Sequence, residues 1–342
     1  MSTVIDIALL LMLVSTALAT VFMRDLFAVI MLFGIYSLLS AGFFLNLSAP
    51  DVALTEAAIG AGISPILMLG TLALTRKKSE SEPQAKKSIN GVFLPLFVVT
   101  ITGATLIYAT FDMPHFMDPE APAHNHVAPR YLEQSYKEIH IPNVVSSVLA
   151  SYRGFDTLGE VFVIFTAGIG VLALLGFLAD GSGRTYWQFA DTASLRHHNI
   201  LHVISKILIP LILLYALYVQ FHGEYSPGGG FQAGVLFATA FILYTMIYGL
   251  QAAYAVISPK VLYWSMVVGV LLYAGTGLAS VFLGGNYLDY NVLAHDPVHG
   301  QHIGIILVEL GVGICVAAVM MSVFFNFAGR TVDPSSQKKG GE

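Results

Sequence analysis

The chain has 342 residues, of which 56% are hydrophobic and only 11% are charged, and its mean hydropathy is +0.74. Soluble domains carry about 25% charged residues, so this composition excludes a soluble globular protein and predicts an integral membrane protein. The net charge of −5 is shared between loops and forms no basic face, which argues against a nucleic acid as partner.

Apolar stretches long enough to cross a hydrocarbon core of about 30 Å, which takes roughly 20 helical residues, recur along the chain. The approximate spans are residues 4–22, 26–47, 51–75, 91–111, 158–179, 200–221, 230–250, 261–283 and 303–326. The predicted fold class is therefore all-α, a polytopic membrane protein with about nine transmembrane helices.

Two hydrophilic stretches, 76–90 and 180–199, divide these spans into a 3 + 2 + 4 arrangement. The expected modules are residues 1–80, residues 81–180 with a long outer loop at 112–157, and residues 195–330. Short loops between the last four spans favour an antiparallel helical bundle in the third module.

Positive charge predicts the orientation, because short cytoplasmic loops collect Lys and Arg. With the N-terminus outside, the residues that fall inside are Arg24, Arg76, Lys77, Lys78, Lys86, Lys87, Arg184, Arg196, Lys260, Arg330, Lys338 and Lys339. Only Arg130, Lys137 and Arg153 fall outside. The first span contains Asp6 and has no basic residue before it, so we interpret it as a retained helix rather than a signal peptide.

The third span contains two acidic residues that need separate explanations. Asp51 fits a capping box with Ser48 as N-cap, and a structural role at the outer end of the helix is the favoured interpretation. Glu56 lies about 140° further round the helix and on the order of 12 Å inside it. A carboxylate there costs at least about 2.5 kcal/mol, which predicts an ion-path residue facing protein or water. The alternative is a protonated interhelical hydrogen-bond donor.

Three charged residues occur in or beside later spans. Glu160 follows Thr157 by three positions, so a capping box alone could account for it. Lys206 could extend towards the cytoplasmic surface, or it could serve the ion path, because Pro210 leaves its carbonyl without a helical donor. Glu309 lies six residues inside the last predicted span without a capping pattern, which predicts a functional role like that of Glu56.

A glycine-rich loop, FHGEYSPGGGFQ at 221–232, precedes the seventh span and includes Pro227, Gly228, Gly229 and Gly230. Such turns can hold anions at a helix start, but this one lacks the Lys-Ser/Thr of a phosphate loop. We interpret it as a tight turn against a neighbouring helix.

No cofactor, metal centre or enzyme activity is expected from the motifs. The outer histidines could bind a metal, but solvated loop residues are the favoured interpretation. These histidines are His115, His124, His126, His140, His295, His299 and His302. Nucleophile elbows, HExxH and dinucleotide-binding patterns have no counterpart here in a fitting context.

Three stretches resemble a known family. APDVALTEAAIGAG, residues 49–62, resembles the signature helix of the small D-type component of membrane-bound hydrogenases, also found in the large A-type component of Mrp-type cation/proton antiporters. IPNVVSSVLASYRGFDTLGE, residues 141–160, resembles the E-type segment that follows it. Residues 207–238 and 299–314 are similar to the four-helix B-type component of Mrp antiporters.

The resemblance implies an accessory ion-path subunit of an antiporter that exchanges Na⁺, or another monovalent cation, for H⁺. It implies that Glu56 and Glu160 correspond to acidic residues on the cation or proton route, and that the SPGGGFQ turn is a family hallmark. The fourteen-helix antiporter module is absent, so the chain is not expected to transport alone. Expected partners are complex I-like antiporter subunits, small Mrp-type subunits and the lipid bilayer of the cell inner membrane. The alternatives are the same module in a hydrogenase-like redox-driven complex, or a purely structural assembly subunit.

Overall fold

The computed structural model describes residues 2–79, 90–115, 118–176 and 199–329. The centre of the predicted linker at 76–90, most of the boundary at 180–199 and the basic tail beyond residue 329 lie outside the described residues. Several of the basic residues behind the predicted orientation lie there too. The described part consists of helices and loops and contains no strand.

The helices of the first half are α1 (Ser2–Phe22), α2 (Leu26–Asn46), α3 (Pro50–Glu56), η1 (Ala57–Ile63), α4 (Ser64–Ser79), α5 (Asn90–Thr110), α6 (Pro122–Asn125), α7 (Val127–Ile139), α8 (Val144–Ser147) and η2 (Val148–Tyr152). Those of the second half are α9 (Gly154–Val171), η3 (Leu172–Gly176), α10 (Asn199–His222), α11 (Gly230–Tyr248), α12 (Leu250–Val256), α13 (Pro259–Phe282), η6 (Tyr290–Leu293) and α14 (Pro297–Ala328). The segments η1, η2 and η3 are π-helical, and η6 is a 3₁₀ helix.

Nine helices in the described part are long and apolar enough to cross a membrane, which confirms the predicted class of polytopic all-α membrane protein. The third span is one continuous helix, Pro50–Ala73, that passes from α3 through the π-helical η1 into α4. The last span begins at Pro297 rather than near residue 303, so Glu309 lies twelve residues, or about 18 Å, beyond the helix start. Pro210 is accommodated inside a continuous α10.

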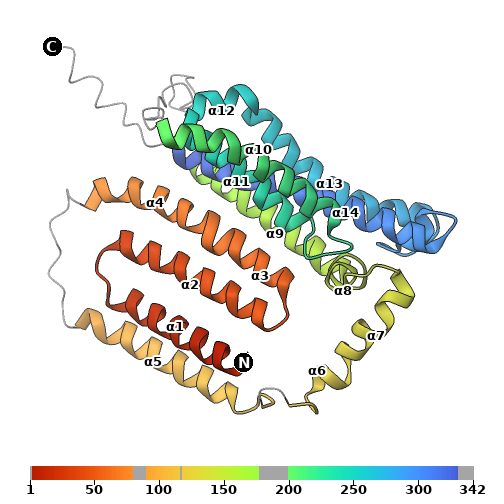
Figure 1. Ribbon diagram of the computed structural model, residues 1–342, viewed down its shortest axis with the longest axis horizontal. Helices are drawn as coiled ribbons and strands as arrows, with labels where there is room; N and C mark the ends of the chain where they lie inside the picture. Colours follow the sequence, from red (N-terminus) through yellow and green to blue (C-terminus); the bar gives the residue numbers. More distant parts are fainter. Residues whose placement is uncertain (1, 80–89, 116–117, 177–198, 330–342) are drawn as a thin grey trace.

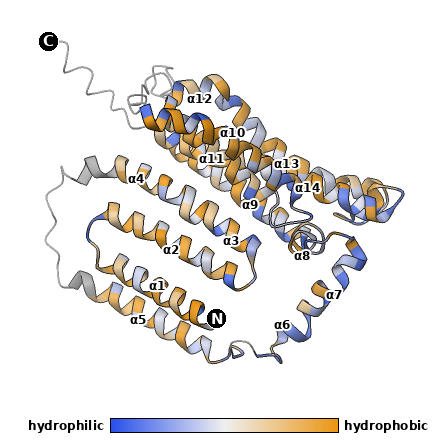
Figure 2. Cartoon of the chain, in the orientation of Figure 1, coloured by the Kyte–Doolittle hydropathy of each residue, from blue (hydrophilic) through white to orange (hydrophobic). Residues whose placement is uncertain are grey.

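Successive spans run in alternating directions (Figure 1). The segment α6–α8 and the loops that precede α11 and α14 therefore gather at one end of the molecule, where α1 also begins. Figure 2 shows that hydrophilic residues concentrate at this end and along α6–α7, whereas α1, α2 and α5 are largely hydrophobic. The candidate site described below lies near the same end.

The packed core lies around α11 and α14, the two spans with the largest buried shares. Helices α9 and α13 pack against α14, while η1 packs against α11. By contrast, no described side chain of α1 or α5 is buried, and the described side chains of α5 are exposed almost throughout. Lipid or other protein chains must cover these surfaces, because apolar spans are stable only in an apolar environment.

Both predicted capping boxes are wrong. Ser48 has a positive φ of 60° and Ala49 is the N-cap of α3, without a side-chain cap. Helix α9 begins at Gly154, and the Thr157 hydroxyl donates to the carbonyl of Leu149 instead of capping a helix. Local capping therefore explains neither Asp51 nor Glu160.

Candidate ion-path site

Asp51 joins segments that are far apart in the sequence. Its side chain is only 6% exposed, and its Oδ1 atom accepts hydrogen bonds from Gly228 N at 3.0 Å and from Asn143 Nδ2 at 3.5 Å. Asp51 also lies in the first turn of α3, where the helix dipole favours a negative charge. The carboxylate is therefore a buried bridge between α3, the segment before α8 and the glycine loop.

Asn143 also binds the loop that follows α10. Its Nδ2 atom donates to the carbonyls of Gly223 at 2.9 Å and Ser226 at 3.0 Å, and its backbone N–H donates to the carbonyl of Glu224 at 2.9 Å. The Ser146 hydroxyl adds a bond of 2.7 Å to the carbonyl of Gly223. These bonds fix residues 223–226 against the start of α8.

The glycines of the loop are required by its close approach to α14. Gly229 has φ +126°, a conformation that side-chain-bearing residues rarely adopt. A Cβ atom on Gly230 would lie 1.9 Å from the carbonyl oxygen of Glu309, so only glycine fits there. The predicted tight turn against a neighbouring helix is confirmed, and its Gly228 N–H does bind an anion, the Asp51 carboxylate.

A cavity of about 250 Å³ lies beside this turn and brings two predicted residues together. Glu160 from α9 and Glu309 from α14 both line it. Its other lining residues are Thr55, Val145, Ser146, Leu149, Ala150, Thr157, Val161, Ile164, Gly228, Gly229, Gly230, Phe231, Gln232, Tyr273, Val308 and Val312. Glu160 is exposed at the surface of the chain, whereas Glu309 is partly buried against Gly229.

Glu224 of the loop before α11 and His302 of α14 form a partly buried polar pair. The Nδ1 atom of His302 lies 2.9 Å from Oε2 of Glu224, a residue that is only 8% exposed. The Oε1 atom of Glu224 is buried without a hydrogen-bond partner. The Glu224 and Asp51 carboxylates both lie close enough to Glu309 to act on it electrostatically.

Glu56 lies at a different place, at the junction between α3 and η1. A Cβ atom on Gly60 would lie 2.7 Å from Oε1 of Glu56 and 2.5 Å from Oγ of Ser37, which places the glutamate between η1 and α2. Lys206 is exposed on α10 among exposed apolar side chains. The structure therefore brings Glu160 and Glu309 together at this cavity and bonds Asp51 to the adjoining glycine loop. Glu56 and Lys206 lie outside the cavity.

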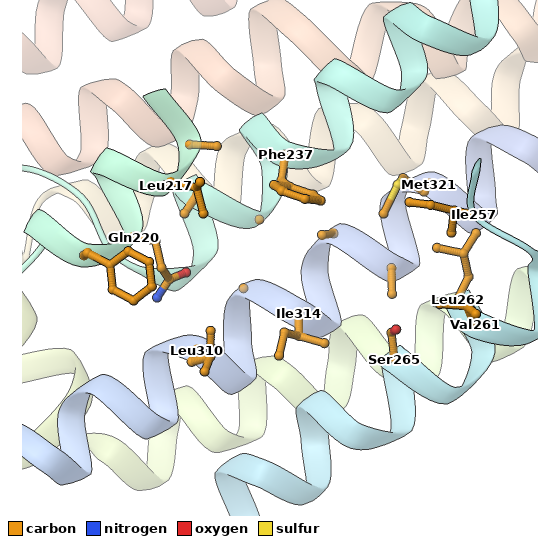
Figure 3. A pocket seen from close by; sticks show the side chains of 17 residues that line it. Leu217, Gln220, Phe237, Ile257, Val261, Leu262, Ser265, Leu310, Ile314 and Met321 are labelled. Carbon is orange, nitrogen blue, oxygen red and sulfur yellow. The ribbon is translucent and has the colours of Figure 1, made fainter. Parts of the chain in front are cut away.

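A second cavity, also of about 250 Å³, lies between α10, α11, α13 and α14 and contains no carboxylate (Figure 3). Its lining is apolar apart from Gln220 and Ser265. Within the described residues, no group of three or more His, Cys, Asp and Glu side chains is arranged to hold a metal ion. The charged cavity near Glu309 is thus the better candidate for an ion path.

Sequence reasoning missed Glu224 and Asn143. Its interpretation of His302 as a solvated loop residue is wrong, because His302 lies in α14 and contacts Glu224. Glu224 lies inside a loop whose sequence signal is its glycines, and His302 has the sequence signal of a loop histidine or a metal ligand. An acidic residue a few positions before a glycine turn gives no local signal of burial. The burial arises because the loop folds onto α8 and α14, as the hydrogen bonds of Asn143 and His302 show.

The outer helix α7 is tied to the same end of the protein by a second polar cluster. Glu138 accepts hydrogen bonds from Tyr152 and from Arg130, the latter at 2.8 Å. The Tyr152 hydrogen bond and the Arg130 charge lower the pKa of Glu138, while burial and Glu138 raise the pKa of Tyr152 to about 12. Both groups therefore keep their ordinary charge states at neutral pH.

Comparison with known protein families assigns most of the chain. Residues 200–322 match the domain related to the MnhB subunit of the Na⁺/H⁺ antiporter. Residues 11–77 match the family MbhD and residues 94–180 match the family MbhE, which are the D-type and E-type components of MBH. The three matches follow one another in the order expected from the resemblance.

Individual relatives agree with these matches. An A/B-type component of a probable K⁺/H⁺ antiporter of Rhizobium meliloti is 28% identical over 313 residues, which are 84% of this chain and 30% of that relative. A putative antiporter subunit mnhB2 of Staphylococcus haemolyticus is 31% identical over 133 residues, which are 38% of this chain and 94% of the relative. The chain thus spans about a third of the A/B-type relative and almost all of the B-type one.

A solved structure has the same fold. A chain of the Mrp complex from Dietzia sp. DQ12-45-1b superposes with a TM-score of 0.70 at 23% identity, over 96% of this chain and 35% of that one. Taken together, the matches define a membrane protein built from D-, E- and B-type segments. This chain belongs to the family of Mrp-type antiporter subunits.

Proposed function

We propose that this chain is a subunit of a multisubunit membrane antiporter that exchanges Na⁺, or another monovalent cation, for H⁺, and that it does not transport alone. The names of the relatives support this function, since they describe K⁺/H⁺ and Na⁺/H⁺ antiporter subunits. Complex I-like antiporter subunits and small Mrp-type subunits would cover the exposed faces of α1 and α5.

The observation that carries the proposal is the cavity shared by Glu160 and Glu309. It lies where the segments matched as D, E and B types meet, because Thr55, Glu160 and Glu309 come from one segment each. A partly desolvated carboxylate binds either a proton or a cation, and exchange needs only that the two compete for the same oxygen atoms.

The remaining predicted residues take separate places in this proposal. Glu56, beside the π-helical η1, forms a second carboxylate on the route, because π-helical segments often occur at functional sites. Asp51 orients the glycine turn under Glu309. Lys206, exposed on α10, acts at a contact with lipid or with a neighbouring protein of the complex. The N-terminus lies on the outer side of the cell membrane, as the distribution of positive charges predicts.

The hydrogenase-like alternative is not favoured. The D-type and E-type families of MBH do match the first two segments. Residues 200–322, however, match a domain related to an antiporter subunit, and the relative that is 31% identical is also named as an antiporter subunit. The structural alternative predicts that the carboxylates of the cavity can be neutralised without loss of transport.

Purification of the intact complex through a tag on this chain tests the proposal. We expect complex I-like and small membrane subunits to copurify, and we expect proteoliposomes to show a pH change when Na⁺ or K⁺ is added outside. Copurifying iron–sulfur or nickel proteins, or the lack of any cation-induced pH change, would refute it.

A further inference from the structure

The face of α14 that carries Glu309 also carries His302. The two residues are seven positions apart, which corresponds to nearly two turns, so they lie on the same face of the helix and about 10 Å apart along its axis. The loop between α10 and α11 runs over this face. Its Glu224 contacts His302, and its Gly229 lies against the Glu309 carboxylate.

Glu224 has an arrangement that structure alone does not explain. One carboxylate oxygen contacts His302, and the other is buried without a hydrogen-bond partner, although the side chain is only 10% exposed. A buried carboxylate oxygen left unpaired destabilises a fold by about 1–3 kcal/mol or more. This oxygen is therefore suited to accept a hydrogen bond from a water molecule, which can carry a proton away from the carboxyl group.

His302 links this carboxylate to the surface. Its side chain is 27% exposed, and it lies in the second turn of α14, a helix that begins at the end of the molecule carrying α6–α8 and the hydrophilic loops (Figure 2). Glu224 acts electrostatically on Glu309 of α14, as does Asp51 of α3, and all three side chains are negative when ionised. A positive charge arriving at His302 is thus attracted inwards.

We infer that His302 and Glu224 form a proton-transfer pair that connects this surface with the cavity of Glu309. The inference rests on the function proposed above and adds the route by which protons reach it. Water delivers a proton to Nε2 of His302, and the Nδ1 proton passes to Oε2 of Glu224, which leaves a neutral imidazole and a neutral carboxyl group. The carboxyl group then releases its proton through water to the Glu309 carboxylate. Proton exchange with water, in which Nε2 of His302 gives up its proton and Nδ1 takes one, restores the starting tautomer.

Some substitutions keep the hydrogen bond but remove the titrating group. They distinguish a role in proton transfer from a purely structural role. In His302→Asn the amide can still donate to Glu224 but does not titrate, and Glu224→Gln keeps the shape of the side chain without its proton. His299→Asn is the matched control, because His299 is exposed one turn earlier on the same helix. Each variant is tested in the full complex in proteoliposomes, at equal amounts of assembled protein.

We expect exchange to fall about tenfold or more in His302→Asn and Glu224→Gln, since positioned acid–base groups contribute on the order of 10²–10⁴-fold. His299→Asn should exchange at the parental rate. Added imidazole should restore exchange by the His302→Ala complex, because this site is reached from the surface. It should not restore exchange by the Glu224→Gln complex. A merely structural histidine would show no such rescue.

Parental rates and pH profile in His302→Asn, or a loss in His302→Ala that imidazole does not relieve, would overturn this inference. Glu309→Gln is measured in parallel to separate the two proposals. If Glu309→Gln abolishes exchange while His302→Asn does not alter it, only the proton-transfer pair is wrong. If Glu309→Gln exchanges like the parent, the proposed role of the cavity is itself wrong.

Discussion

Replacement of Gly230 by alanine probes the contact on which the site depends. The added Cβ atom would lie 1.9 Å from the Glu309 carbonyl oxygen, whereas ordinary contacts begin at 3.4 Å. Helices α11 and α14 would therefore have to separate by about 1.5 Å, the difference between the two distances. Overpacking of this kind destabilises a protein by about 1–3 kcal/mol.

The single cysteine provides the assay. Cys315 lies on α14 and is 0% exposed, so a thiol-reactive fluorophore labels it only when the bundle opens. We expect Gly230→Ala to lower the temperature at which labelling begins and to reduce exchange by the complex.

Gly275→Ala on α13 is the matched control. A Cβ atom there meets nothing within 4 Å, so alanine should leave stability unchanged or raise it by about 0.5–1 kcal/mol. Gly230→Ala protein that unfolds at or above the parental temperature would show that the close approach of α11 to α14 is not required.

Three further predictions concern residues outside the cavity. A complex with Glu56→Gln should assemble but lose most of its exchange activity. Exchange at the parental rate would show that Glu56 serves only in packing. Lys206→Ala should weaken exchange more than Lys206→Arg if a positive charge on α10 is required, and equal parental rates would show that it is not. In a Cys315→Ala background, a cysteine at Ser81 should be labelled only from the cytoplasm and one at Asn125 only from outside; the reverse would overturn the orientation.

Hydropathy and composition predicted the spans, because a helix that crosses a membrane must be predominantly apolar over about 20 consecutive residues. The positions of the nine apolar helices of the described part therefore agree with the predicted spans. Only the ends of some helices differ from the prediction, such as the start of α14 at Pro297. The tight glycine turn was predictable for a similar reason, since consecutive glycines have few structural uses other than close approach.

The roles of individual carboxylates were less predictable. Asp51 matched a capping pattern, but its hydrogen-bond donor is Gly228, which is 177 residues away in the sequence. No local sequence pattern indicated that Glu224 is buried, because its burial depends on how the loop packs onto α8 and α14. Local patterns describe a residue's own helix, whereas these partners are set by tertiary contacts.

Glu309→Gln tests the central claim most directly, because Glu309 lines the cavity and lies close to the Asp51 and Glu224 carboxylates. The measurement is the pH change that added cation produces in proteoliposomes, with Glu133→Gln on the exposed face of α7 as the control. The account predicts a fully assembled Glu309→Gln complex whose exchange is about tenfold or more below that of the parent and of the control. Parental exchange by assembled Glu309→Gln complex would contradict it.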